Sequence, residues 1–493
     1  MEKWFAIPII ILWWLLTLPT PINPFPTNNT EEVSITLELD WEMSHAYLGS
    51  PSYRVYLWES GKPSKLVGET KNTNFKPGTL EYNTWYSWKV EAVDGKKKKF
   101  GETWNFKTLS QPRIIKHKLL NLGNDLIVRD MKATPDGGFI LVGDAVFEND
   151  SRDIFVAKIN RSLEIEWKTI INEPLANDFA FSVLVKNSRY ILVGCKVIQG
   201  KKDAILIEID RNGNLVKKQV FEGKNSDCFT SIANTKDGGY AVAGWTYSNL
   251  NNLSDEDKRK IWVIKFDAYG NIQWQRLYGD HWANSAKYIE QTKDGGFIIT
   301  GWINYDKEAE FGGNDDIYIL KTDKNGNPIW EYKTGGEYQD TGNKVIQTDD
   351  RGFLVLATTS QLKNNKLSFK VSKGVLLIKL NSYGREFWRK TFEGEGNVEA
   401  LDIIKVENNN YAFIGNTTSD SNSNSTQKLW LVNIDDSGNI NWQKTEETRS
   451  NFSGTCVLYT GKGEYVITGY SFDGFDLLTD AWIRKLGPYI SYK

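Results

Sequence analysis

Apolar runs recur along most of the chain at intervals of about 55 residues. Each run begins with an aromatic residue and is apolar at consecutive positions, as in the Phe-Ile-Leu-Val-Gly run of residues 139–143. A run without polar alternation predicts a strand that is covered on both faces. The seven runs are residues 139–143, 190–194, 240–244, 297–301, 353–357, 411–415 and 465–469.

The residues around each run repeat as well. An Asp-Gly-Gly turn precedes several runs, and an apolar strand with Lys follows, then a turn such as Asp-x-Asn-Gly-Asn and a strand centred on Trp. A less regular strand comes before the Asp-Gly-Gly turn, as in residues 286–292 and 398–406. Each copy therefore predicts four antiparallel strands. Short strands and glycine turns at this period are typical of a β-propeller, so we expect seven blades over residues 113–493.

The ends of this array must meet if the sheets form a ring. Residues 114–119 match the Trp-bearing strand but have no copy of their own, and the seventh copy ends near Gly487. Either residues 114–119 or residues 489–492 supply the last strand of blade seven. Closure of the ring would leave no exposed sheet edge.

Residues 32–109 lack the long repeat and alternate between apolar and polar positions, with Gly and Pro turns between the runs. This predicts a small β-sandwich. The segment resembles a fibronectin type III domain in Trp41, in residues 86–94 and in the closing run 104–108, and it carries no Arg-Gly-Asp. We expect Trp41 and Trp88 to be core residues. The predicted fold class is therefore all-β, a fibronectin type III-like sandwich followed by a seven-bladed propeller.

The N-terminus indicates export. Lys3 precedes an apolar run over residues 4–18. Residues 1–22 are therefore interpreted as a signal peptide or an N-terminal membrane anchor, and residues 23–31 as a linker. Both interpretations place the body outside the cytoplasm, either secreted or tethered to the membrane.

Charge and cysteine content narrow the function. The formal net charge is -2, so no nucleic-acid partner is expected. Cys195, Cys228 and Cys456 are far apart, which gives neither a disulfide framework nor a zinc spacing, and Cys195 is interpreted as a small core residue.

The repeats over residues 113–488 resemble those of secreted bacterial and archaeal propeller proteins, many of which carry fibronectin-like modules. That resemblance implies a fold and an extracytoplasmic setting. The spacing of Asp267, Gly270 and Trp274 also resembles the repeats of quinoprotein propellers, but the vicinal disulfide of those enzymes is absent. The sialidase box has only an approximate match, in residues 471–474, with its Gly one place early.

The turns at Asp210/Asn212/Asn214 and Asp323/Asn325/Asn327 have the oxygen-rich side chains that calcium prefers, but their spacing departs from an EF-hand loop. Asn-Gly turns of this kind, and the turns at Asp136, Asp237 and Asp294, are expected to be structural hairpins. His281 is the histidine that most merits inspection. We assign no catalytic, cofactor-binding or metal-ligating residue from the sequence.

Four insertions differ in length and sequence between the second and third strands of their copies: residues 247–260, 304–315, 361–373 and 418–428. Unequal loops on a rigid scaffold are common binding surfaces. We therefore expect an extracytoplasmic protein that binds a protein or a polysaccharide through these loops. The alternatives are a polysaccharide-active hydrolase or lyase with its site in the propeller channel, and a non-catalytic envelope scaffold. The oligomeric state stays open.

Overall fold

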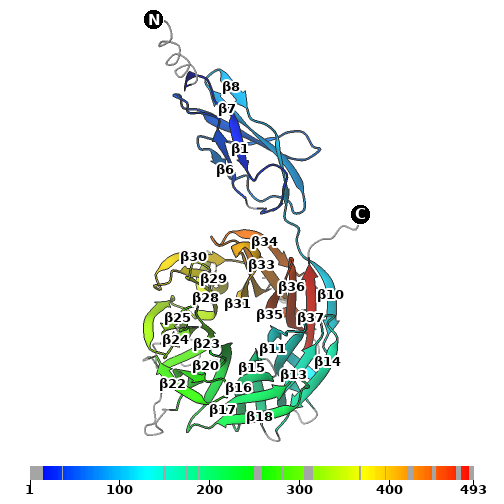
Figure 1. Ribbon diagram of the computed structural model, residues 1–493, viewed down its shortest axis with the longest axis vertical. Helices are drawn as coiled ribbons and strands as arrows, with labels where there is room; N and C mark the ends of the chain where they lie inside the picture. The colour runs from blue at the N-terminus through cyan, green and yellow to red at the C-terminus, as the bar shows by residue number, and fades with distance from the viewer. Residues whose placement is uncertain are drawn as a thin grey trace. The chain divides into compact units, whose positions relative to one another are not determined.

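The computed structural model describes residues 15–35, 37–147, 151–173, 176–186, 189–248, 258–279, 282–304, 315–365, 368–394, 396–418, 426–446, 451–472 and 479–487. The chain divides into two compact units (Figure 1). The first contains residues 1–113, 432–443 and 488–493, and the second contains residues 114–431 and 444–487. Most of the N-terminal apolar run lies outside the described residues. Within the described ranges, no helix is long and apolar enough to cross a membrane.

The N-terminal part of the chain forms two sheets. One has the strand order β1-β3-β6, and the other has the order β2-β9-β7-β4-β5 with β8 paired to β7. β1 and β2 include residues of the segment that the sequence suggests as a linker, because extended backbone becomes a strand when a sheet edge accepts it. The strands are β1 Pro21–Phe25, β2 Thr30–Val33, β3 Leu39–Met43, β4 Ser52–Glu59, β5 Leu66–Thr70, β6 Asn74–Phe75, β7 Trp85–Asp94, β8 Lys97–Phe100 and β9 Trp104–Thr108.

These two sheets share one aromatic core. Trp41 of β3 packs edge-on against Tyr53 of β4, with ring centroids 5.5 Å apart, and against Trp88 of β7 at 6.4 Å. Trp88 also contacts Trp104 of β9 at 4.8 Å. Trp41 and Trp88 are fully buried, which confirms that they are core residues.

The rest of the chain forms seven four-stranded antiparallel sheets, numbered here in chain order. Their strands are, in sheet one, β11 Asn124–Ala133, β12 Phe139–Val146, β13 Arg152–Ile159 and β14 Ile165–Ile171; in sheet two, β15 Asn177–Lys186, β16 Arg189–Ile198, β17 Lys201–Asp210 and β18 Leu215–Phe221; in sheet three, β19 Asp227–Asn234, β20 Tyr240–Thr246, β21 Lys260–Phe266 and β22 Ile272–Tyr278; in sheet four, β23 Ala283–Gln291, β24 Phe297–Asn304, β25 Asp315–Thr322 and β26 Pro328–Thr334; in sheet five, β27 Thr341–Gln347, β28 Phe353–Asn365, β29 Ser368–Leu380 and β30 Glu386–Phe392; in sheet six, β31 Val398–Lys405, β32 Tyr411–Thr418, β33 Gln427–Ile434 and β34 Ile440–Thr445; in sheet seven, β10 Arg113–Leu119, β35 Asn451–Gly461, β36 Glu464–Phe472 and β37 Asp480–Gly487. A 3-10 helix, η1 Glu407–Asn409, joins β31 to β32.

In sheet seven the strands are counted from β35, so that β36 is its second strand and β10 its last. The second strand of each sheet is buried on both faces, as the continuous apolar runs predict. In β12, Phe139 and Leu141 belong to a core shared with sheet seven, whereas Ile140 and Val142 belong to a core shared with sheet two. Alternate residues of one strand therefore face different neighbouring sheets.

Successive sheets contact one another through their first strands, and β35 of sheet seven contacts β11 of sheet one. In Figure 1 the first strands β11, β15 and β23 lie closer to the centre of the second unit than the last strands β14, β18 and β22. Sheet seven has the order β10-β37-β36-β35. The strand without a copy of its own therefore completes the seventh sheet, and residues 489–492 lie outside the described residues.

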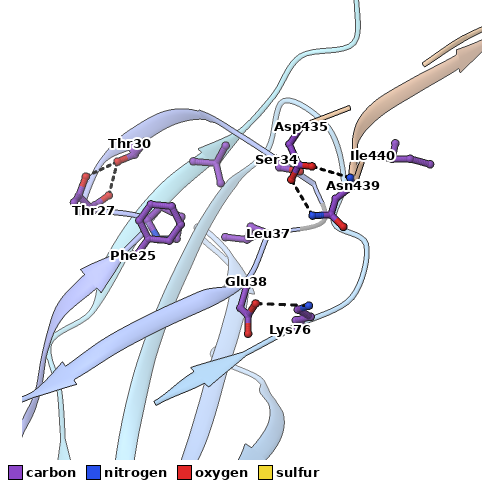
Figure 2. A pocket seen from close by; sticks show the side chains of 12 residues that line it. Phe25, Thr27, Thr30, Ser34, Leu37, Glu38, Lys76, Asp435, Asn439 and Ile440 are labelled. Atoms are coloured by element: carbon purple, nitrogen blue, oxygen red, sulfur yellow. Dashed lines mark hydrogen bonds and ion pairs between the residues drawn. The ribbon is translucent and has the colours of Figure 1, made fainter. Parts of the chain in front are cut away.

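The Asp-x-x-Gly turns between the third and fourth strands are held by their own aspartates. In the turn drawn in Figure 2, Asp435 accepts hydrogen bonds from the Asn439 backbone amide at 2.7 Å and from its side-chain amide at 2.9 Å. Glycine is required in the sheet-two turn, because Gly213 has a φ of 88° and a Cβ there would lie 2.7 Å from the Trp167 ring.

Candidate functional site

The first strand of every sheet contains a bulge at an equivalent position. One residue is skipped in the pairing with the second strand, for example between Ala286 and Tyr288 of β23. The skipped residues have unrelated chemistry although the strands around them repeat. They are Arg129, Phe181, Thr230, Lys287, Asn343, Leu401 and Thr455.

Several side chains at or beside the bulges connect neighbouring sheets. Thr230 donates to the carbonyl of Ala286 at 2.8 Å, and Asn343 donates to that of Ala400 at 2.5 Å. Asp130, one residue past its bulge, accepts from the Val183 amide of sheet two at 2.9 Å. The bulges therefore bind the first strands together where each ladder is interrupted.

Two ion pairs lie past the bulges. Lys132 and Asp130 are 2.6 Å apart, and Lys344 and Asp402 are 2.5 Å apart. Burial lowers the pKa of each lysine and the neighbouring aspartate raises it, with a net rise for both. Burial, followed by the charges of Asp130 and Asp402, raises the pKa of the Cys456 thiol. Because each of these lysines already has a carboxylate partner, we interpret the two ion pairs as structural and not as a binding site.

A polar pocket of about 200 Å³ is lined by residues of the first strands of sheets four, five and six and by residues at or near the insertions of sheets four and five. Three of its residues, Asp315, Ser360 and Lys373, directly flank or end the insertions of sheets four and five, and Trp302 lies two residues before the first of them. Hydroxyl, amide and charged side chains dominate the wall. The complete lining is Lys287, Trp302, Asp315, Gln339, Thr341, Asn343, Thr358, Ser360, Lys373 and Glu399.

Asp315 is fixed at one wall of the pocket. One carboxylate oxygen accepts from the side-chain amide of Asn304 at 2.8 Å, and the other accepts from that of Gln339 at 3.0 Å. Burial raises the pKa of Asp315, although both amide donors lower it. Asp315 is therefore an oriented carboxyl group with both oxygens engaged.

Lys287 and Glu399 differ from Asp315 in that both are exposed to solvent. Neither makes a hydrogen bond or an ion pair with another described residue. Burial lowers the pKa of Lys287 even though its surface stays accessible, because protein atoms crowd the space around it; Glu399 raises this pKa and Arg259 lowers it. The pocket thus offers one ammonium and one carboxylate that influence each other's charge but make no direct hydrogen bond or ion pair with a described residue.

Aromatic residues surround Arg259 next to the pocket. The Arg259 guanidinium lies 4.3 Å from the centroid of the Trp302 ring and 5.2 Å from that of Trp245. Such cation–π contacts hold a tryptophan in one orientation. Trp302 is therefore a fixed wall of the pocket.

The structure places the turn residues as hairpins. In the turns of Asp210 and Asp323, each aspartate accepts hydrogen bonds from two backbone amides and from one Asn side chain of its own turn. Asp136, Asp237 and Asp294 each pair with a buried lysine. Within the part of the chain that the structure describes, no three His, Cys, Asp or Glu residues are grouped so that they could hold a metal ion.

Other sequence candidates are dispersed. His281, Asp473 and Gly474 lie outside the described residues. His117 accepts a hydrogen bond from Arg484 at 2.9 Å, and burial, followed by the charge of Arg484, lowers its pKa. The cysteines are free and buried, which confirms the core assignment of Cys195. The fold brings the thiols of Cys195 and Cys228 together from sheets two and three, although they are far apart in sequence.

The insertions are only partly described, because residues 249–257, 305–314 and 419–425 lie outside the described ranges. The insertion at 361–373 extends a regular hairpin, in which Asn365 pairs with Ser368. Sequence reasoning missed Lys287, Asn343 and Glu399. Alignment of the seven first strands would have shown that the position of Lys287 and Asn343 varies in chemistry while its neighbours repeat.

Comparison with known proteins gives partial similarity. No protein-family model matches the chain. The regulatory protein FlaEY of Caulobacter vibrioides is 24% identical over 206 residues, which cover 38% of this chain and 21% of that protein. The chain thus matches about a fifth of the length of that relative.

Two solved structures show weak likeness. The core factor of S. cerevisiae aligns with a TM-score of 0.41 and 9% identity over 77% of this chain and 62% of that one. Immunoglobulin domains 1–5 of Sidekick-1 align with a TM-score of 0.13 and 8% identity over 92% and 96% of the two chains. At these scores neither likeness supports a statement about fold or function.

Proposed function

We propose that the seven sheets form a closed seven-bladed β-propeller and that the N-terminal sheets form a fibronectin type III-like sandwich. Support for closure comes from the pairing of β10 with β37 and from the contact between β35 and β11. Support for the sandwich comes from the core of Trp41, Trp88 and Trp104 between two sheets.

We further propose that the protein is an extracytoplasmic binding protein that recognises a polysaccharide through the polar pocket. The observation that carries this proposal is the composition of the pocket. Lys287 and Glu399, which make no hydrogen bond or ion pair with a described residue, lie in it beside a wall of hydroxyl and amide side chains. Sugar hydroxyls both donate and accept hydrogen bonds, so they match such a wall. A space of about 200 Å³ is on the scale of one sugar ring, which favours a saccharide over the flat surface of a folded partner.

The binding test uses the full chain on an array of neutral and charged polysaccharides, followed by calorimetry on each retained ligand. Glu399→Gln should weaken binding about tenfold, because a carboxylate accepts stronger hydrogen bonds than an amide. Glu222→Gln is a matched control on an exposed residue outside the pocket. No retained polysaccharide, or equal affinity of the two variants, would contradict the proposal.

The extracytoplasmic setting rests on the apolar run after Lys3. Fusion of residues 1–31 to alkaline phosphatase, an enzyme that becomes active only after export, tests it. A fusion that is produced but inactive would contradict export.

One observation favours a polysaccharide-active enzyme as a second candidate. Asp315 and Glu399 share the pocket, and burial raises the pKa of Asp315, as in the acid of a glycoside hydrolase. Turnover of a retained polysaccharide that is abolished by Asp315→Asn would establish this candidate. Binding without turnover would favour the binding protein.

A further inference from the structure

Two lysines of the pocket make no direct ion pair with a described residue. Lys287 and Lys373 line the pocket, and neither ammonium makes an ion pair with any described residue. Of the two carboxylates, Asp315 accepts from two side-chain amides, and Glu399 alone keeps both oxygens available within the described part of the chain. The guanidinium of Arg259 lies against the Trp302 ring, and while burial raises the pKa of Asp315, the charge of Arg259 lowers it.

We propose that the pocket binds an acidic sugar unit, a pyranose ring that bears a carboxylate, with Lys287 pairing to that carboxylate and Glu399 accepting from its hydroxyls. This inference rests on the proposed function, because it names the kind of polysaccharide that the same site selects.

The position of Lys287 supports the assignment. Its side chain occupies the bulge of β23, whose backbone is fixed by the ladder with β24 on both sides. The neighbouring sheet holds Asn343 at its own bulge through hydrogen bonds to Thr358 and to the Ala400 carbonyl. A cation on such a rigid frame loses little conformational entropy on binding beyond that of its own side chain.

The chemistry of the alternatives is less favourable. A neutral sugar would add no counter-charge to the Lys287 ammonium, whose charged form burial disfavours even with Glu399 nearby. A basic sugar would add a further cation next to Lys287 and Lys373. A carboxylate ligand adds a negative charge in direct contact with Lys287, and it accepts charge-assisted hydrogen bonds from the ammonium.

Calorimetry on the full chain tests the inference with three probes: trisaccharides of galacturonic, glucuronic and mannuronic acid, each beside its carboxyl-reduced neutral counterpart. At least one acidic probe should bind about tenfold or more tightly than its neutral counterpart at low salt. The difference should shrink in high salt, because the charge pair is partly screened.

Three variants separate the role of Lys287 from a general effect of charge. Lys287→Gln should lose the preference for the acidic probe, and Lys287→Arg should keep most of it, because Arg retains the cation. Lys217→Gln removes an exposed lysine of β18 and should change nothing. Thermal unfolding of each variant checks that Lys287→Gln stays folded.

The outcomes distinguish the two levels of the proposal. Equal affinity for acidic and neutral probes that is unchanged by Lys287→Gln would overturn the acidic-sugar assignment and leave the polysaccharide-binding function standing. Absence of binding to every saccharide, together with retention of a protein partner, would overturn both. Loss of the acidic preference in Lys287→Gln alone would support the inference.

Discussion

The ammonium of Lys321 on β25 lies 3.0 Å from a carboxylate oxygen of Asp294, in the hairpin that precedes β24. The Lys321 side chain is only 4% exposed, whereas that of Asp294 is 59% exposed. Equivalent pairs join Lys158 to Asp136, Lys265 to Asp237 and Lys379 to Asp350.

Sheets two and six have other residues at the position of this lysine. Sheet two reverses the charges, since Glu208 occupies the lysine position of β17 and pairs with Arg189 at 2.6 Å. Sheet six has Asn433 at this position, which accepts a hydrogen bond from Asn441 at 2.9 Å. In these six sheets the buried polar group at this point is thus partnered, as burial requires.

Removal of one aspartate should destabilise the protein by leaving a buried cation without its counter-charge. Asp294→Ala is expected to lower the free energy of unfolding by about 2 kcal/mol, less than for a fully buried pair because Asp294 is half-exposed. Urea denaturation measures the change. The control Lys324→Ala alters an exposed turn residue of the same sheet and should have an effect of less than about 0.5 kcal/mol.

A double substitution checks the physical reason. If the cost arises from the unpaired Lys321 ammonium, then Asp294→Ala combined with Lys321→Met should be less destabilising than the sum of the two single changes. Strictly additive effects would contradict the pairing.

Acid should weaken these pairs in a defined window. Burial raises the pKa of Asp237, but hydrogen bonds from Lys265, Thr235 and the Gly239 amide outweigh it and lower the pKa to about 2, from an ordinary value of 3.8. A carboxyl group with a depressed pKa stabilises the fold above its unfolded pKa, and this contribution is lost as the pH falls from about 4 to about 2. Between pH 5 and pH 2 the melting temperature should fall less steeply for Asp237→Asn than for the natural chain. Identical slopes would show that Asp237 does not contribute.

Glu290 on β23 should produce the opposite dependence near neutral pH. Burial raises the pKa of Glu290 to about 7, although Lys344 and the backbone amide of Gln347 lower it. Because the folded state favours the protonated form, the stability that this proton provides is complete below about pH 4.5 and is lost as the pH rises through 7. Glu290→Gln should therefore raise the melting temperature at pH 8 relative to the natural chain, with little change at pH 5. If the melting temperatures of Glu290→Gln and the natural chain differ by the same amount at pH 5 and pH 8, the raised pKa is contradicted.

Arg484 should stabilise sheet seven through its buried hydrogen bonds. It lies on β37, donates to Glu446 at 2.9 Å and to His117 of β10 at 2.9 Å, and is buried together with Glu446. Arg484→Gln leaves the Glu446 carboxylate buried without a cation, so we expect a loss of about 3 kcal/mol in the free energy of unfolding. Guanidinium denaturation provides the measurement, with Arg385→Gln in an exposed turn as the control. A loss below about 1 kcal/mol would show that Glu446 is relieved in another way.

Local patterns in the sequence were sufficient to predict the repeated strands and turns. The continuous apolar runs predicted strands buried on both faces, and the Asp-x-x-Gly turns predicted hairpins, because both depend on a few neighbouring residues. The aromatic core of Trp41 and Trp88 followed for the same reason.

Only the tertiary structure decided which unlike residues meet. Lys287 and Glu399 lie in different sheets. The chain has 60 Lys and Arg residues and 62 Asp and Glu residues, and nothing in the local sequence singles out these two. The pairing of Asp294 with Lys321 and that of β10 with β37 join segments 27 residues and several hundred residues apart. The sequence by itself determined the strands and turns of each repeat, because a strand or a turn is set by local periodicity and backbone preference. The pocket was decided by the packing of neighbouring sheets, because the bulges that carry Lys287 and Asn343 come together only after those sheets have assembled.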